Sequence, residues 1–144
     1  MFIGEYSHTL DKKNRLAVPV KFRKDLGDNA VITRGLDNSL QLYPMAAWKE
    51  IAVKLGEMPI GESQTRSFVR LMLAGAAEVS LDKLGRILIP EYLKKFAGLK
   101  KDTKINGLFN RVEIWDTASW DSYKNRAEKD SNKAAEKLGE LGVF

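Results

Sequence analysis

The stretch "LDKLGRILIP" at residues 81–90 has a near copy, "LDKKNRLAVP", at residues 10–19. The identities that a shift of 71 positions brings into register include Asp11, Lys12, Arg15 and Pro19 in the first copy and Asp82, Lys83, Arg86 and Pro90 in the second. Repeated units of this kind commonly cannot bury their apolar faces alone. The duplication therefore predicts two similar units that pack against each other.

The likeness between the two copies continues downstream. After one inserted residue, "SLQLYPMAAW" (39–48) matches "RVEIWDTASW" (111–120). The paired positions are Leu40 with Val112, Leu42 with Ile114, and Trp48 with Trp120. The repeat thus covers a whole structural unit and not only one short motif.

Each copy predicts the same order of elements. Alternating residues in "FIGEYSHTL" and "AAEVSL" indicate a strand, which a tight turn joins to a second strand, "LAV" or "ILI". Pro19 and Pro90 suit the first position of a short helix, and Gly27 and Gly98 suit its end. Two further strands complete each copy, "AVIT" and "LQLY" in the first and "TKIN" and "VEIW" in the second. The fold class expected is mainly β with α, that is α+β, built from two tandem ββαβ-type units.

Helices are expected outside the repeated cores. Pro44 opens a helix with apolar residues at helical spacing up to Gly56, and Asp116 can cap the matching helix of the second copy. The predicted division is 1–56 for the first unit with its following helix, 57–76 for a linker and helix, 77–123 for the second unit, and 124–144 for a C-terminal helical tail. The tail is a polar helix for which we expect fraying or a role between subunits.

The repeated turn predicts a defined backbone geometry. Gly85 can take a positive φ at the reversal, and Asn14, which replaces it in the first copy, tolerates that conformation best after glycine. The carboxylates of Asp11 and Asp82 can accept hydrogen bonds from backbone amides just ahead of them. These four residues are therefore interpreted as structural parts of the turns.

The arginines of the turns have two possible roles. Arg15 and Arg86 could form a salt bridge to a nearby aspartate or to a neighbouring chain, or they could present an exposed guanidinium to phosphates or to O6 and N7 of guanine. Lys12, Lys13 and Lys83 add positive charge to the same turns. Rigid turns that carry cations twice per chain suit DNA with repeated sites.

Composition agrees with an anionic partner and gives little support to other classes. The net charge of +5 favours such a partner. The chain has no cysteine, no apolar run long enough to cross a membrane and no secretory signal at its start, so the cytoplasm is the expected location.

Catalysis has few candidate groups. His8 is the only histidine, and no HExxH, P-loop, GxGxxG or GxSxG motif occurs. We therefore predict a protein that is not an enzyme and has no catalytic residue, metal site, cofactor, membrane partner or small-molecule substrate.

The chain resembles the MraZ family of bacterial transcriptional regulators in three segments: "MFIGEYSHTLDKKNRLAVPVKFR" (1–23), "FVRLMLAGAAEVSLDKLGRILIP" (68–90) and "LFNRVEIWDTASW" (108–120). The resemblance implies two AbrB-like units that pair into one swapped-hairpin β-barrel, and chains that form a homo-oligomeric ring of eight or more subunits, such as an octamer. Single-copy AbrB-like antitoxins and sporulation regulators share the hairpin unit, but the duplication argues against them.

The resemblance also implies a function and the residues that perform it. Proteins of this family bind short direct repeats of double-stranded DNA upstream of their own gene in the division and cell-wall cluster, usually as a repressor, which implies association with the nucleoid. The implied DNA-contacting residues here are Arg15 and Arg86, supported by Lys12, Lys13 and Lys83. One departure is that Asn14 stands where the family usually has glycine. The alternative hypothesis is a non-catalytic assembly protein whose basic turns bind an acidic protein partner or associate with the nucleoid nonspecifically.

Overall fold

The computed structural model describes residues 1–143 and has mixed α+β architecture, which confirms the predicted fold class. The first unit contains β1 (Phe2–Thr9), β2 (Arg15–Ala17), α1 (Val20–Leu26), β3 (Asn29–Arg34) and β4 (Leu40–Pro44), followed by α2 (Met45–Gly56) and α3 (Ser63–Ala74). The second unit contains β5 (Ala77–Ser80), β6 (Arg86–Leu88), α4 (Glu91–Ala97), β7 (Asp102–Phe109) and β8 (Arg111–Asp116), followed by α5 (Thr117–Lys129) and α6 (Ser131–Glu140).

The two units share one antiparallel sheet with the strand order β1-β7-β8-β4-β3-β5. Each strand in one half of this order has its equivalent from the other unit at the mirrored place in the other half: β1 corresponds to β5, β7 to β3 and β8 to β4. The sheet therefore has a pseudo-two-fold axis between β8 and β4. The first strand of each unit, β1 or β5, pairs only with a strand of the other unit. Each unit therefore completes the sheet of its neighbour. Closure of these strands into a barrel stays a prediction.

A separate two-stranded ribbon, β2 with β6, also joins the units. Leu16 lies opposite Ile87 at its centre, and the register places Arg15 opposite Leu88. Leu16 and Ile87 are each only 1% exposed and belong to a single apolar cluster to which both units contribute. Burial of this cluster is the main stabilising contribution to the fold, and neither unit supplies it alone.

The short helices end as the sequence predicts. Gly27 with φ 79° follows α1, and Gly98 with φ 59° follows α4, so each glycine takes a backbone conformation that other residues rarely adopt. Pro19 and Pro90 precede the first helical residue by one position and are not that residue, because each keeps an extended ψ, 136° and 141°.

Two local predictions about α5 and the tail are wrong. The side chain of Asp116 does not cap α5, because its carboxylate instead accepts the backbone N–H of Lys100 at 3.1 Å. The tail is not one helix, because α5 ends at Lys129 and a new helix begins at Ser131. Ser131 donates its hydroxyl to the carbonyl oxygen of Glu128 at 2.9 Å, and a serine that bonds backbone groups in this way competes with helix continuation.

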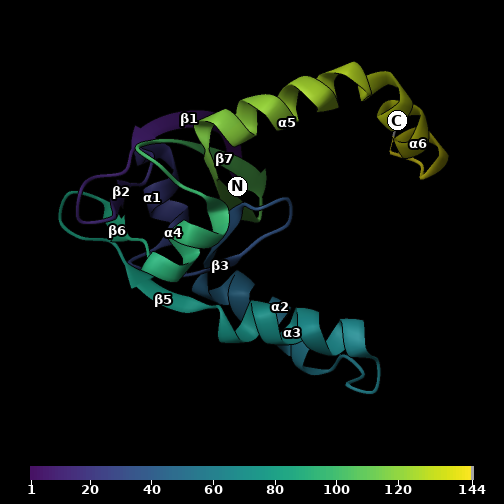
Figure 1. The fold of residues 1–144 in the computed structure, drawn as a ribbon, viewed down its shortest axis with the longest axis horizontal. Coiled ribbons are helices and arrows are strands. Elements are labelled where there is room, and N and C mark those ends of the chain that lie inside the picture. Colours follow the sequence, from purple (N-terminus) through teal and green to yellow (C-terminus); the bar gives the residue numbers. More distant parts are fainter. Residues whose placement is uncertain (144) are drawn as a thin grey trace.

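Figure 1 shows how the elements are placed. The loops that precede β2 and β6 lie together at one edge of the molecule, whereas the helix pairs α2–α3 and α5–α6 extend toward the opposite side. None of the helices in the described part of the chain combines the length and the apolar character that a membrane span requires. The edge that carries the two loops is the region in which the sequence placed its candidate binding residues.

Candidate nucleic-acid interface

The first turn is organised around the carboxylate of Asp11. Its Oδ1 accepts the backbone N–H groups of Lys13 and Arg15, both at 2.8 Å. Its Oδ2 accepts Nε of the Arg15 side chain, also at 2.8 Å. One aspartate therefore fixes both the backbone of the turn and the direction of the arginine that ends it.

The second turn repeats this arrangement around Asp82. Oδ1 accepts the backbone N–H groups of Leu84 and Arg86 at 2.9 Å, and Oδ2 accepts Nε of Arg86 at 2.8 Å. The hydrogen bond from the backbone N–H of the arginine lowers the pKa of each aspartate, and the guanidinium lowers it further, so both carboxylates stay ionised at neutral pH. The two turns thus have the same geometry although their middle residues differ.

Residues with positive φ close both turns. Asn14 has φ 61° and donates its backbone N–H to the carbonyl oxygen of Asp11 at 3.0 Å. Gly85 has φ 74° and makes the equivalent bond to Asp82 at 2.9 Å. Asparagine is the residue that replaces glycine most readily in this conformation, which explains why the first turn keeps its shape.

The two turns are also bonded to each other. Val18 donates its backbone N–H to the carbonyl oxygen of Gly85 at 2.9 Å, and Ile89 donates to that of Asn14 at 2.8 Å. These bonds lie beside the β2–β6 ribbon, so a continuous set of backbone bonds holds both turns at the same edge of the molecule (Figure 1). Their separation and orientation are therefore set by the fold and not by a flexible linker.

The arginine side chains combine the two roles that the sequence left open. Those of Arg15 and Arg86 are 35% and 28% exposed, and each uses Nε to bind its own aspartate. Within residues 1–143 the terminal nitrogens of both guanidinium groups make no hydrogen bond. An arginine held through Nε can still present those nitrogens to a phosphate or to guanine. Lys12, Lys13 and Lys83 are exposed on the same turns.

Sequence reasoning missed the residues that hold the side chain of Asn14. Its Nδ2 donates to Oε2 of Glu91 at 2.8 Å, and its Oδ1 accepts Nζ of Lys94 at 3.0 Å. Both partners lie on α4 of the other unit. The repeat shift of 71 places Val20 and Arg23 at the equivalent positions of α1, so the two copies differ together at all three sites. Aligning the copies reveals the differences, but their contact is visible only in the fold.

Arg23 occupies the corresponding space above the second turn. It donates Nε to the carbonyl oxygen of Val18 at 2.9 Å, and a Cβ built on Gly85 would overlap the Arg23 guanidinium. Glycine is therefore needed at position 85 for two reasons, its positive φ and the side chain that lies on it.

Gly85→Ala is expected to destabilise the protein by about 1–2 kcal/mol, because alanine is strained at positive φ and its methyl group would displace Arg23. Urea denaturation measures the change. The double variant Gly85→Ala with Arg23→Ala should lose less than the sum of the single variants, since the overlap is then absent. Strict additivity of the two changes would mean that Arg23 does not restrict position 85.

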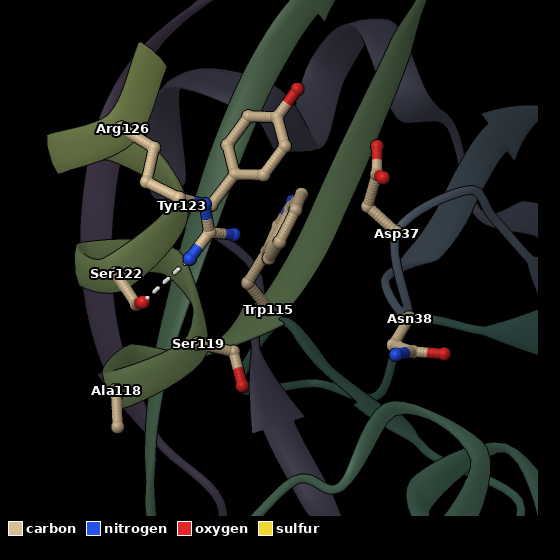
Figure 2. Close-up of a pocket in the computed structure, with 8 residues that line it drawn as sticks. All are labelled: Asp37, Asn38, Trp115, Ala118, Ser119, Ser122, Tyr123 and Arg126. Atoms are coloured by element: carbon tan, nitrogen blue, oxygen red, sulfur yellow. Dashed lines mark hydrogen bonds between the residues drawn. The ribbon is translucent and has the colours of Figure 1, made fainter. Parts of the chain in front are cut away.

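A second concave region lies between the β3–β4 loop and α5, far along the chain from the turns. Figure 2 shows Trp115, Tyr123 and Arg126 on one side and Asp37 and Asn38 on the other, around an open cavity of about 520 Å³. Arg126 is held within its helix, because it donates to Ser122 Oγ at 2.9 Å and lies over the ring of Tyr123. In residues 1–143 no group of three or more acidic or histidine side chains gathers as metal donors.

Comparison with known proteins agrees with the repeated architecture. The model of the family described as "MraZ protein, putative antitoxin-like" matches residues 1–71 and again residues 72–140. A protein of Natranaerobius thermophilus named transcriptional regulator MraZ is 48% identical over 143 residues, which cover 99% of this chain and 100% of that protein. Proteins with the same name from Clostridium acetobutylicum and Clostridium tetani are 47% and 46% identical over the same shares. The chain therefore belongs to the MraZ family.

Proposed function

We propose that the protein is a sequence-specific DNA-binding transcriptional regulator that uses its two DxxxR turns as readers. The supporting observation is that both turns carry the same Asp-to-Nε bond, at 2.8 Å, and are fixed side by side by backbone bonds. Arg15 and Arg86 are the proposed base or phosphate contacts, and Lys12, Lys13 and Lys83 the supporting phosphate contacts. The names of the relatives agree with this role.

In this proposal the target is double-stranded DNA with short direct repeats upstream of the protein's own gene in the division and cell-wall cluster, where binding represses transcription. Each pair of turns reaches few phosphates, so one protomer alone should bind weakly. A ring of eight or more chains, an octamer for example, would engage several repeats at once and gain affinity through effective concentration. The protein would then be associated with the nucleoid.

The proposal is tested by titrating the purified full-length chain into fluorescent duplexes at near-physiological salt. One duplex carries the direct repeats from the upstream region and the other carries the same bases scrambled. We expect the repeats to bind at least about a thousandfold more tightly, within the range that separates specific from nonspecific binding. Light scattering on the same samples measures the number of chains in the assembly.

Equal binding of both duplexes would refute sequence-specific regulation and would favour nonspecific nucleoid association. Absence of binding to either duplex would favour the rival hypothesis, an assembly protein that uses its basic turns for an acidic protein partner. A steep salt dependence alone would not decide between specific and nonspecific binding, because phosphate neutralisation produces it in both cases.

A further inference from the structure

A pocket of about 450 Å³ lies beside the first turn and is lined by four lysines, Lys12, Lys94, Lys100 and Lys101. Lys12 comes from the turn itself, Lys94 from α4, and the other two from the segment that joins α4 to β7. Lys12 belongs to the first unit, whereas the other three lysines lie close together in the sequence of the second unit. The fold therefore adds the positive charge of the first turn to a basic segment of the other unit.

The four ammonium groups have little local neutralisation. Among the described residues none of them forms an ion pair, and the one polar contact of their Nζ atoms is the bond from Lys94 to Asn14 Oδ1. Asp11 also lines the pocket, but its carboxylate is occupied by two backbone N–H groups and Arg15. Asp116 is buried behind Lys100 and accepts its backbone N–H.

The walls of the pocket are fixed by the backbone. Leu10 donates its N–H to the carbonyl oxygen of Lys101 at 2.8 Å, which ties the end of β1 to the start of β7. Lys94 is held from the other side by Asn14. The lysine stems are therefore anchored on rigid segments, although their ends are free to adjust to an anion.

The lysine lining of this pocket is not repeated in the other unit. The N–H of Leu81 makes the bond equivalent to that of Leu10, but its acceptor is the carbonyl oxygen of Asp28 at 3.0 Å, so an acidic residue stands in the place of Lys101. The connection from α1 to β3 is also two residues shorter than that from α4 to β7, and it has no counterpart of Lys100. The pocket is thus a property of the first turn alone.

We propose that this lysine pocket binds a phosphate group. Lysine ammonium groups are general phosphate ligands, and the four lysines that line this concavity supply positive charge for one oxyanion. The phosphate comes either from the strand of DNA that the first turn contacts, an assignment that rests on the proposed function, or from a free phosphorylated molecule.

The experiment uses the full-length double variant Lys100→Gln with Lys101→Gln, since both side chains are exposed and neither supports the turn. The matched control is Lys49→Gln with Lys54→Gln, two exposed lysines of α2 that lose the same charge elsewhere. If the pocket holds one DNA phosphate per bound repeat, raising salt from 50 to 200 mM weakens the pocket variant about threefold less per repeat than the wild type. The control variant keeps the wild-type salt dependence.

Two further measurements identify the source of the phosphate. A single neutral methylphosphonate is moved along the repeat duplex, and one position should weaken the wild type and the control but not the pocket variant. Separately, pyrophosphate is titrated into the DNA-free protein while the amide NMR signals of Thr9, Leu10 and Lys101 are followed. Shifts without a sensitive DNA position assign the pocket to a free phosphorylated ligand.

The results separate failure of the pocket from failure of the proposed function. If the pocket variant behaves as the control does in the salt and methylphosphonate series, and pyrophosphate shifts none of these signals, the phosphate site is refuted while DNA recognition stands. If pyrophosphate binds at the pocket but the wild type does not prefer repeat DNA, the site stands and the regulator proposal fails.

Discussion

Replacing both Arg15 and Arg86 with alanine is expected to lower the preference for repeat DNA by at least about thirtyfold. Each arginine that contacts a guanine contributes about 1–3 kcal/mol of discrimination, so the two together contribute about 2–6 kcal/mol. Binding to both duplexes should also weaken, because Asp11 and Asp82, now without their guanidinium partners, would repel the DNA backbone. Fluorescence titration against repeat and scrambled duplexes measures it.

Arg15→Lys with Arg86→Lys is the matched control, because it keeps the charge and removes the planar fork. This variant should retain most binding to scrambled DNA and lose much of the preference for repeats. Light scattering must show the same assembly in all variants. An intact preference in the alanine variant would exclude these arginines as readers, and dissociation of the assembly would show that their main role is a structural salt bridge.

Leu16→Ala is expected to destabilise the fold by about 2–5 kcal/mol. Leu16 is 1% exposed and lies opposite Ile87 in the ribbon that joins the units, so its truncation leaves a cavity at the pseudo-two-fold axis. Because one sheet contains interleaved strands of both units, we expect both units to unfold in a single transition. Urea denaturation followed by tryptophan fluorescence and by circular dichroism measures the loss.

Leu88→Ala provides the control for this substitution. Leu88 follows Ile87 on the same strand but is 59% exposed, so its truncation should change stability by no more than about 0.5 kcal/mol. Two separate unfolding transitions in the Leu16 variant would contradict the interdependence of the units. Equal effects of the two substitutions would contradict the assignment of the core.

Much of the fold was predictable because the same pattern of strand and helix signals occurs in both units. Strands such as "LQLY" and "VEIW", and the helix stops at Gly27 and Gly98, follow from local patterns that the second copy repeats. Local patterns do not contain the pairing of strands between units, which joins residues far apart in the sequence, such as Phe2 with Phe109 and Asn29 with Ser80. They also failed at Asp116, whose side chain bonds Lys100 from a neighbouring segment and not its own helix.

The candidate site was also predictable only in part. The sequence placed Arg15 and Arg86 at the ends of two turns, and the structure brings these turns to one edge, although their contact with DNA stays a prediction. It did not indicate that Glu91 and Lys94 hold Asn14, or that Lys100 and Lys101 lie beside Lys12. Each of these contacts joins residues of different units, and the charge of a single segment does not reveal it.

The covalent fusion of two interleaved units has a consequence for the symmetry of the target. A homodimer of single units must present identical turns, so it is matched to palindromic sites. In this chain one turn can change while the other stays the same. The first turn contains Asn14, which is bonded to residues of α4, whereas the second contains Gly85, which lies against Arg23. The chain therefore resembles a heterodimer whose two subunits are covalently joined, and its two turns are distinguishable. If the turns read DNA as proposed, this asymmetry would fit sites that point in one direction along the double helix, which is the arrangement that head-to-tail repeats provide.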